Sequence, residues 1–280
     1  MTEIVNVEQA QAWNGGQAQS WLDREDQHAI AARAHREALL RAAAIVAGEH
    51  VLDVGCGTGA TTLAAARAAG ATGSAVGLDI SEPMLVRARE HAAAERLGNV
   101  SFVCADAQVA PLGEHRYDLV SSMFGVMFFA DPIAAFQNLA RATRPGGRLA
   151  FVSWRPPAEN EWIQVLRGGV ARGRHLSAPP MGVPGMFGLA EHEHIARVVA
   201  SAGFDELQLE ALDLPFALGP IDDACAFGAE VGVVRAVLDG LEPAARAEAL
   251  ESLRGALAPH DGPDGVVLES AVWIVTARRR

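Results

Sequence analysis

A buried run of residues leads into three closely spaced glycines, and this pattern is typical of a turn that holds a nucleotide-like ligand. Residues 51–54 are apolar except for Asp53, and they are followed by Gly55, Gly57 and Gly59. Glycine permits a sharp turn, and its lack of a side chain lets a ligand lie against main-chain amides at a helix N-terminus. Asp53 is a candidate for contact with that ligand. A compatible, simpler role for Asp53 is to accept hydrogen bonds from amides of the turn.

Two more carboxylates follow apolar runs further along the chain. Asp79 ends the segment GLD after residues 74–78, and Asp106 lies in the segment ADA after residues 100–104. Asp79 could accept hydrogen bonds from both hydroxyls of a ribose, and Asp106 could accept one from an adenine amino group. Hydrogen bonds to a charged group of this kind are each worth roughly 1.5–3 kcal/mol. The simpler alternatives are a helix cap for Asp79 and an ordinary loop position for Asp106.

The glycine spacing leaves two classes of ligand open. Ala60 stands where the dinucleotide pattern G-x-G-x-x-G/A has its third small residue, so the loop alone is compatible with a nicotinamide dinucleotide. Asp79 fits that ligand as well. The every-second-residue spacing of the glycines and the presence of Asp106 disfavour the nicotinamide dinucleotide.

The elements that position these residues alternate between strands and helices. Short apolar runs alternate with longer segments of helical period, and the strand residues are apolar at nearly every position. This alternation predicts an α/β fold with a doubly wound, Rossmann-like, mostly parallel seven-stranded sheet. Ligands of such sheets bind outside the carboxyl ends of the strands, where the carboxylates above would converge. The first five strands are expected at residues 50–54, 74–78, 100–104, 117–122 and 148–153, with helices at 60–69, 83–97 and 133–143.

The flanking regions are less regular and predict a lid. Residues 1–48 read as a loop followed by an amphipathic helix over 27–47, and residues 155–190 are rich in proline and glycine. A helix at 191–202, a strand near 206–216 and a last strand at 266–277 complete the sheet. We therefore expect an N-terminal lid, 1–48, and one ligand-binding domain, 49–280, with insertions at about 155–190 and 221–258.

The overall composition excludes several classes of protein. The chain has 280 residues and a net charge of −11, whereas nucleic-acid binding requires a basic surface. No apolar stretch approaches the roughly 20 residues of a membrane span, and the N-terminus lacks the pattern of a signal peptide. The three cysteines are widely spaced, which favours a reduced, cytoplasmic protein. We expect a small-molecule partner, no nucleic acid and no membrane; the sequence does not indicate an oligomeric state.

Histidines are the natural candidates for a general base, because their ordinary pKa lies near neutrality. His192 and His194 are two residues apart, so on a helix they would not share a face, and no metal site is expected. His35 also lies outside the motifs. His28 and His175, next to the predicted lid segments, are the two candidate catalytic residues.

Taken together, the motifs resemble those of the class I methyltransferases that use S-adenosylmethionine (SAM), in particular the small-molecule branch that includes quinone-biosynthesis and sterol enzymes. The resemblance rests on VLDVGCGTG, GLDIS, ADAQ, YDLVSSMFGVMFF and LARATRPGGRLAFVSW, in the family's order, over about residues 50–154. It implies SAM as the cofactor and roles for individual residues around it. The residues implied to bind SAM are Asp53, Gly55, Cys56, Gly57, Asp79, Ile80, Met84, Asp106, Ala107, Ser122 and Phe124, with Trp21 and Gln27 folding over it from the N-terminal segment.

The resemblance implies methyl transfer by in-line displacement onto a small molecule. The segment SSMF after the fourth strand lacks the Asn/Asp-Pro-Pro-aromatic motif of relatives that methylate adenine or glutamine nitrogen, which again argues against nucleic acid. The tryptophans of the predicted lid, with Phe187, favour a hydrophobic or aromatic acceptor. A nicotinamide-dependent oxidoreductase and a non-catalytic SAM-binding module are the alternatives that this reasoning leaves open.

Overall fold

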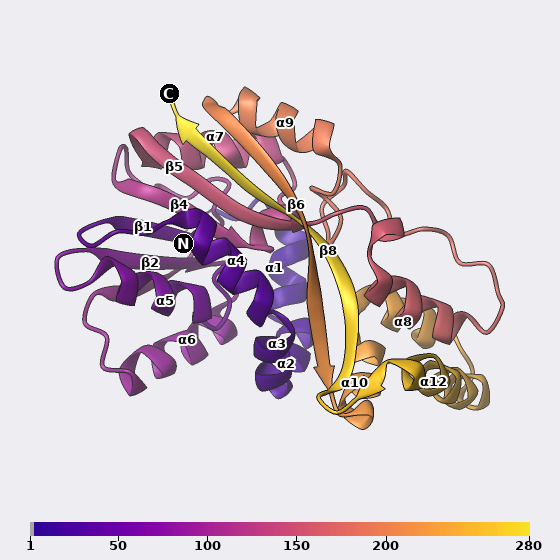
Figure 1. Ribbon diagram of the computed structural model, residues 1–280. Coiled ribbons are helices and arrows are strands. Elements are labelled where there is room, and N and C mark those ends of the chain that lie inside the picture. Colours follow the sequence, from indigo (N-terminus) through magenta and orange to yellow (C-terminus); the bar gives the residue numbers. More distant parts are fainter. Residues whose placement is uncertain (1–2) are drawn as a thin grey trace.

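One twisted sheet forms the centre of the protein in the computed structural model, which describes residues 3–280 (Figure 1). The sheet order is β3-β2-β1-β4-β5-β8-β6, and a two-residue strand, β7, pairs with β8. Strands β1 to β5 are parallel, whereas β8 runs antiparallel to both of its neighbours. The predicted mostly parallel, seven-stranded Rossmann-like sheet is confirmed. Its strands are β1 (His50–Val54), β2 (Ser74–Asp79), β3 (Val100–Cys104), β4 (Tyr117–Met123), β5 (Thr143–Trp154), β6 (Phe204–Gly219), β7 (Asp261–Gly262) and β8 (Gly265–Arg279).

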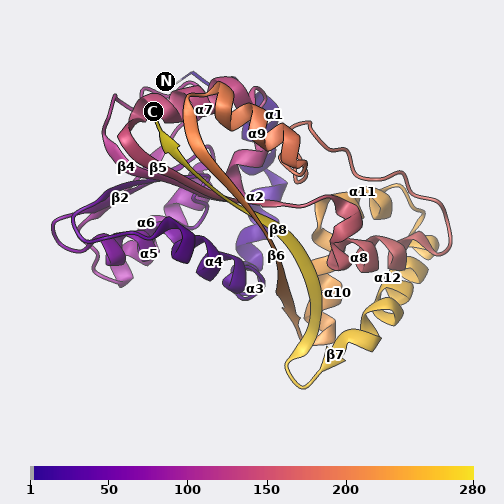
Figure 2. The same ribbon diagram turned by 45° about the horizontal axis from the view of Figure 1, so that its top comes forward.

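Helices cover both faces of this sheet, as its apolar strands require. Figure 2 shows α4 (Arg33–Ala43), α5 (Ala60–Ala69) and α6 (Glu82–Ala94) on one face, and α7 (Pro132–Ala142) and α9 (His192–Ser201) on the other. The central strands β1 and β4 are almost wholly buried between these layers. Over the described residues, no helix is both long and apolar enough to span a membrane.

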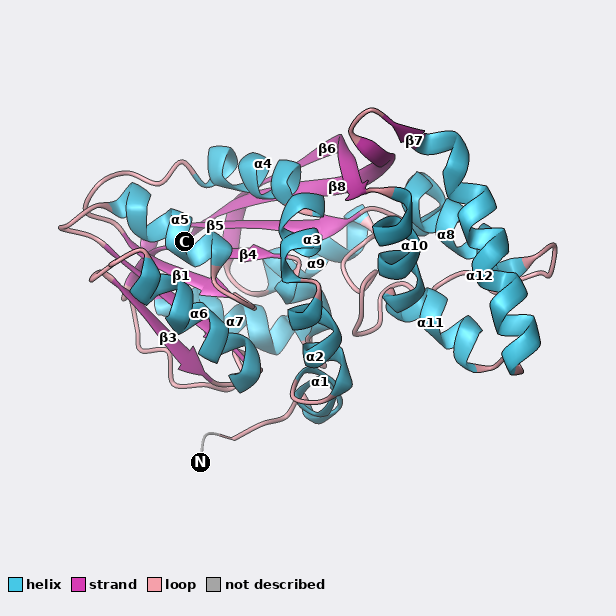
Figure 3. Cartoon of the chain, turned by 90° about the horizontal axis from the view of Figure 1, so that it is seen from below, coloured by secondary structure: helices cyan, strands magenta, loops and turns pink. Residues whose placement is uncertain are grey.

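A group of helices packs beside the far halves of β6 and β8, which extend well beyond the parallel strands (Figures 1 and 3). We call this group the cap: α8 (Glu161–Ala171), α10 (Ile221–Glu230), α11 (Gly232–Asp239) and α12 (Pro243–Leu257). Helices α8 and α12 approach so closely that a Cβ on Gly169 would lie 2.9 Å from the Cα of Leu253. The expected helical character of residues 221–258 is confirmed. Residues 155–190 contain the short helix η2 (Pro157–Glu159) and α8, followed by an irregular segment.

The N-terminal region differs from its prediction. In place of a loop and one helix over 27–47, it forms α1 (Val7–Trp13), α2 (Gly16–Asp23) and α3 (Glu25–Ala31) before α4. The helix breaks fall at positions with non-helical backbone, such as Arg24 with φ −126°. Helices this short are not stable alone, so their formation depends on tertiary packing that a local pattern does not reveal. Figure 3 shows α1, α2 and α3 lying between the sheet and the cap.

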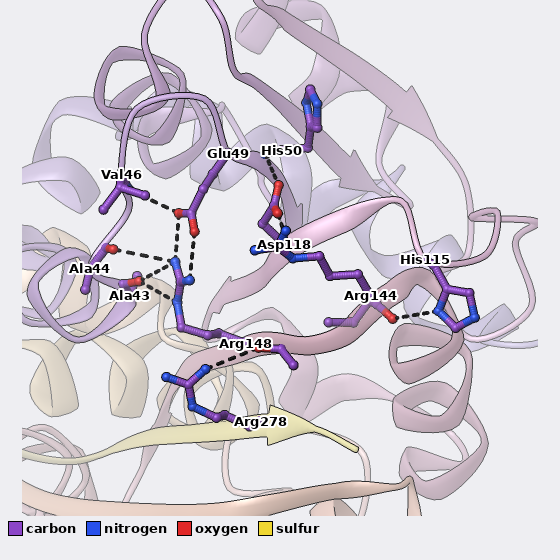
Figure 4. Close-up of polar contacts among 12 residues, drawn as sticks. Ala43, Ala44, Val46, Glu49, His50, His115, Asp118, Arg144, Arg148 and Arg278 are labelled. Carbon is purple, nitrogen blue, oxygen red and sulfur yellow. Dashed lines mark hydrogen bonds and ion pairs between the residues drawn. The ribbon is translucent and has the colours of Figure 1, made fainter.

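At the amino ends of the parallel strands, a charged network ties α4 to the sheet (Figure 4). The guanidinium of Arg148 donates to both carboxylate oxygens of Glu49, each at 2.7 Å, and also to the carbonyls of Ala43 and Ala44 at the end of α4. Glu49 is 6% exposed. The hydrogen bonds from Arg148 hold the pKa of Glu49 below its ordinary value. This pair lies at the amino ends of the strands, whereas the glycine loop lies at their carboxyl ends. Its role is therefore to stabilise the fold.

We predict that Arg148→Met lowers the free energy of unfolding by roughly 2–4 kcal/mol at pH 7, because it leaves the buried carboxylate of Glu49 unpaired. Since the folded pKa of Glu49 is depressed, this stabilisation is present above its ordinary value of 4.5 and is lost as the pH falls below it. Urea denaturation of both proteins at pH 7 and at pH 4 measures the difference.

Arg33→Met is the matched control, because Arg33 and Glu37 form an ion pair whose side chains are 75% and 59% exposed. Its effect should stay within about 0.5 kcal/mol. An Arg148→Met effect as small as that of the control would show that the network contributes nothing measurable.

Candidate active site

The glycine loop after β1 is held against the end of β2 by main-chain hydrogen bonds. The amides of Gly55 and Cys56 both donate to the carbonyl of Leu78, and the amide of Gly57 donates to the carboxylate of Asp79 at 2.7 Å. Gly57 has φ +54°, and a Cβ built there would meet nothing within 4 Å. The loop therefore presents bare backbone to open space at the start of α5, which is the arrangement that a ligand against main-chain amides requires.

The exit of β4 closes against the same loop. A Cβ on Gly55 would lie 2.7 Å from the Cα of Gly125, and one on Gly125 would lie 2.7 Å from the carbonyl oxygen of Val54. The buried hydroxyl of Ser122 links the two segments: it donates to that carbonyl at 2.7 Å and accepts from the amide of Val126. Ser122 is one of the residues that the resemblance implies in SAM binding, and its hydroxyl is already used in holding β1 and β4 together.

Asp79 and Asp53 lie on either side of the glycine loop with acceptor capacity to spare. Each oxygen of Asp79 accepts one main-chain hydrogen bond, from Gly57 and from Ser81. Asp53 is buried and accepts hydrogen bonds from the hydroxyls of Thr62 and, more weakly, Ser121. A carboxylate oxygen accepts two hydrogen bonds, so both groups retain free lone pairs. Burial raises the pKa of Asp79 above its ordinary value and that of Asp53 to about 7.

Asp106 is buried beneath the N-terminal segment. One oxygen accepts from the amides of Val5 and Asn6 at 2.9 and 2.8 Å, and the other from the Asn6 side chain and the amide of Gln108 at 2.7 and 3.0 Å. All the hydrogen-bonding capacity of this carboxylate is thus used within the protein. Its contact with adenine stays a prediction, and it would require Asn6 to move. The neighbouring Ala107 is buried as well.

Phe124, at the exit of β4, has a backbone conformation that is rare for a bulky residue. Its φ is +65°, in the left-handed region that costs a non-glycine residue of order 1–3 kcal/mol. Its amide is fixed by the carbonyl of Val152, and its ring stacks on that of Trp154 with centroids 4.3 Å apart. Such strain is concentrated at functional sites. Here it holds a partly exposed aromatic ring next to the glycine loop.

Phe124 is one end of a continuous row of ring contacts, which we call the aromatic seam. Successive ring centroids are no more than 6.1 Å apart. The other end reaches β2, because Ser81 donates to the carbonyl of Trp13. The seam therefore runs from the end of β2, across the N-terminal helices and the cap, to the end of β4. Its members are Trp13, Trp21, His28, Phe227, Phe216, Trp162, Trp154 and Phe124, with His35 against the last two.

The two candidate bases have different surroundings. His28 lies in the seam, stacked on Trp21 with centroids 3.6 Å apart. Burial, and to a lesser degree the charge of Arg24, lowers the pKa of His28 to about 4, so it is uncharged at neutral pH. His175 is exposed in the segment after α8, and no described contact joins it to the seam or the glycine loop. The structure therefore brings His28, but not His175, to the candidate site.

The remaining predicted residues divide between the cofactor loop and the fold. Ile80 is partly exposed beyond β2, whereas Met84 is 2% exposed. Burial raises the pKa of the Cys56 thiol, which makes it unreactive. The side-chain amide of Gln27 donates to the carbonyls of Leu218 and Asp223, and so fastens α3 to β6 and α10. The structure does not bring Gln27 to the glycine loop, and its cofactor role stays a prediction.

Several residues of the site were not identified from the sequence. Asn6 bridges Asp106 and the amide of Ala130, and Asn14 bonds the carbonyl of Ile80 and the amide of Glu82. Both come from the N-terminal region, where no pattern indicates which polar side chain meets which strand end. The segment Trp13-Asn14-Gly15-Gly16 was one available signal, because a tryptophan beside a helix-breaking pair favours a fixed turn.

Comparison with known proteins assigns this geometry to a family. A family model described as a methyltransferase domain matches residues 51–147. A demethylmenaquinone methyltransferase of Shouchella clausii is 38% identical over 113 residues, which are 40% of this chain and 48% of that protein. The nocamycin O-methyltransferase of Saccharothrix syringae is 30% identical over 251 residues, covering 83% of this chain and 86% of the relative. The chain belongs to the class I SAM-dependent methyltransferases.

Within that family it belongs to the small-molecule branch, as the names of both relatives indicate. The first match spans about half the length of its relative, over the region of the sequence motifs. The fold agrees: the YcgJ protein of Bacillus subtilis superposes with a TM-score of 0.60 at 16% identity, over 88% of this chain and 97% of that one. Membership of the methyltransferases disfavours the nicotinamide-dependent alternative.

We predict that cofactor binding strengthens as the pH rises through about 7, on the expectation that Asp53 ionises next to the ammonium group of the cofactor, a group that S-adenosylhomocysteine also carries. Burial raises the pKa of Asp53 to about 7 in the free protein. If the cation keeps Asp53 ionised, the Kd for S-adenosylhomocysteine should fall roughly tenfold between pH 6 and pH 8. Calorimetric titration at the two pH values measures this change.

Asp53→Asn should bind more weakly and lose the pH dependence. The stability of the free protein changes with pH in the opposite direction. Because the pKa of Asp53 is raised in the folded state, this group stabilises the fold at low pH, and its contribution is lost as the pH rises from about 4 to about 7. Equal pH dependence of binding in Asp53→Asn and in the parent would assign the titration to another group.

Proposed function

We propose that this protein transfers the methyl group of SAM to a small, apolar, aromatic molecule. The observation that carries the proposal is the position of the aromatic seam, whose two ends lie at the ends of β2 and β4, with Phe124 next to the glycine loop. In this proposal the glycine loop binds the cofactor, and the seam binds the acceptor. The names of the relatives support a small-molecule acceptor.

The residues of the loop suit SAM in their chemistry. The bare backbone at Gly57 leaves room for the methionine part, and the free lone pairs of Asp79 suit the two hydroxyls of a ribose. The bound cofactor supplies an already activated methyl group, so the protein needs no nucleophile of its own. The task of this chain is to orient the acceptor and to exclude water.

We assign the exclusion of water to a lid made of three segments, namely residues 1–48, of which 1 and 2 lie outside the described residues, and the insertions 155–190 and 221–258. Each of them contributes rings to the seam: Trp13, Trp21, His28 and His35 come from the first, Trp162 from the second and Phe227 from the third. A lid with so many aromatic side chains favours a flat, hydrophobic acceptor, because offset and edge-to-face ring contacts add stabilisation beyond burial. We propose that residues 49–280 form one SAM-binding domain, as the sequence predicts.

A non-catalytic SAM-binding module is the second candidate, and the seam argues against it. Continuous aromatic contacts from three separate segments are more than cofactor binding alone requires.

We predict that the protein binds S-adenosylhomocysteine with micromolar affinity and does not bind NADH. Asp79→Asn should weaken that binding about tenfold to a hundredfold, because the variant loses charge-assisted hydrogen bonds to the ribose. Isothermal titration calorimetry measures both ligands.

Asp264→Asn is the control for that experiment, since Asp264 is exposed in the turn before β8. It should bind like the parent protein. Binding of NADH, or unaltered binding by Asp79→Asn, would overturn the assignment of the loop.

A further prediction concerns the acceptor. Phe227→Leu should raise the KM of the acceptor by about threefold to tenfold through loss of ring contacts, and should change the Kd of S-adenosylhomocysteine by less than about twofold. Steady-state methyl transfer and calorimetry give the two constants.

Phe136→Leu is the matched control, because Phe136 is equally buried but packs against Phe129 and Phe151, away from the seam. It should lower stability and leave the acceptor KM alone. An equal rise of KM in both variants would remove the seam from acceptor binding.

A further inference from the structure

One polar side chain of the seam has an unused hydrogen-bonding position. His35 on α4 has no exposed surface, and its ring contacts Phe124, Trp154 and Phe216 with centroid distances of 5.5, 5.3 and 6.0 Å. Its Nε2 lies 2.8 Å from the hydroxyl of Ser270 on β8. Its Nδ1 is buried and has no hydrogen-bond partner within residues 3–280. A buried polar atom without a partner is uncommon and calls for an explanation.

The neighbours of His35 determine which of its nitrogens carries the hydrogen. The hydroxyl oxygen of Ser270 also lies 2.8 Å from the carbonyl oxygen of Leu214. Two oxygens at this distance need a hydrogen between them, and only Ser270 carries one. The hydroxyl of Ser270 therefore donates to Leu214 and accepts from Nε2–H of His35. Neutral imidazole has a single N–H, so Nδ1 carries a bare lone pair.

His35 is also uncharged over the working pH range. Burial lowers the pKa of His35 to about 4, and the nearby carbonyl of Ala31 offsets only part of that effect. The groups that face the ring are the hydroxyl of Ser270, the main-chain carbonyl of Ala31 and the three aromatic rings, none of which is charged. His35 is therefore a fixed hydrogen-bond acceptor in otherwise apolar surroundings.

We propose that Nδ1 of His35 accepts a hydrogen bond from a hydroxyl group of the methyl acceptor, which makes the acceptor a hydroxylated aromatic molecule and oxygen the methylated atom. This inference rests on the proposed function and deepens it. His35 is suited to the role because its ring touches Phe124, which borders the glycine loop, and also touches the cap-side ring of Phe216. An acceptor that replaces part of these ring contacts meets Nδ1 as its hydrogen-bond partner.

In the same arrangement, Nδ1 of His35 can accept the proton of the hydroxyl group. As the acceptor oxygen forms its bond to the methyl carbon, the carbon–sulfur bond breaks and its electron pair stays on sulfur. The oxygen, still bonded to hydrogen, becomes strongly acidic, so the weakly basic Nδ1 can take the proton. The imidazolium that forms keeps its hydrogen bond from Nε2 to Ser270, and it loses the proton to water when the lid opens.

The experiment measures a ligand preference in protein saturated with S-adenosylhomocysteine. The probes are 2-naphthol, which donates a hydrogen bond, and 2-methoxynaphthalene, which does not. We expect calorimetry to show 2-naphthol binding roughly fivefold to tenfold more tightly, and we expect His35→Phe to abolish the preference. Nitrogen-15 spectra of the histidine rings should show His35 protonated at Nε2, with its Nδ1 signal moved by 2-naphthol and not by the ether.

The controls separate this proposal from the proposed function. Ser270→Ala removes the partner of Nε2–H without changing the ring, so it should reduce the preference even if His35→Phe does not fold. His50→Phe places the same change at an exposed position at the opposite edge of the sheet, and it should keep the preference. His35→Phe should still bind S-adenosylhomocysteine, whereas failure of the parent protein to bind it would refute the proposed function itself. A proton on Nδ1, an unchanged preference in His35→Phe, or no binding of 2-naphthol would overturn the role of His35.

Discussion

The ends of β1 and β4 approach each other so closely that neither Gly55 nor Gly125 has room for a side chain. This contact sets the positions of the other parts of the site. It directs the glycine loop toward Asp79, and it places Phe124 in a left-handed conformation beside that loop. The hydroxyl of Ser122 fixes the contact from within the fold. The charged network around Arg148 stabilises the amino ends of the parallel strands, whereas the carboxyl ends carry the candidate site.

The site combines carboxylates on one side with uncharged rings on the other. Asp53 immediately precedes the glycine loop and Asp79 accepts a hydrogen bond from it; burial raises the pKa of both, so a cationic ligand would be favoured there. The seam carries no charge at neutral pH, because burial lowers the pKa of His28 and of His35 to about 4. A cation held between carboxylates and uncharged aromatic rings is a suitable arrangement for transfer of a methyl group from sulfonium. In the transition state the positive charge is spread over sulfur, the methyl carbon and the acceptor oxygen, and an apolar environment favours that dispersal.

The sheet and its motifs could be predicted from the sequence because they follow from local patterns. Apolar runs marked β1 and β3 at their observed bounds, and glycine spacing located the ligand loop. The N-terminal helices could not be predicted, since α1, α2 and α3 are short and exist through contacts such as that between Asn6 and Asp106, 100 residues apart. The role of His35 could not be predicted for a similar reason. Its surroundings are formed by Ser270, 235 residues away, and by rings at the ends of β4 and β5 and on β6.

The central claim is that the cofactor lies at the glycine loop with the N-terminal segment closed over it. Hydrogen–deuterium exchange with and without S-adenosylhomocysteine tests this claim most directly. We expect slower exchange at residues 55–59, at 79–84 and in the N-terminal residues 5–14, with little change in α12 of the cap. Protection confined to the cap or to the opposite edge of the sheet, with none at residues 55–59, would contradict it.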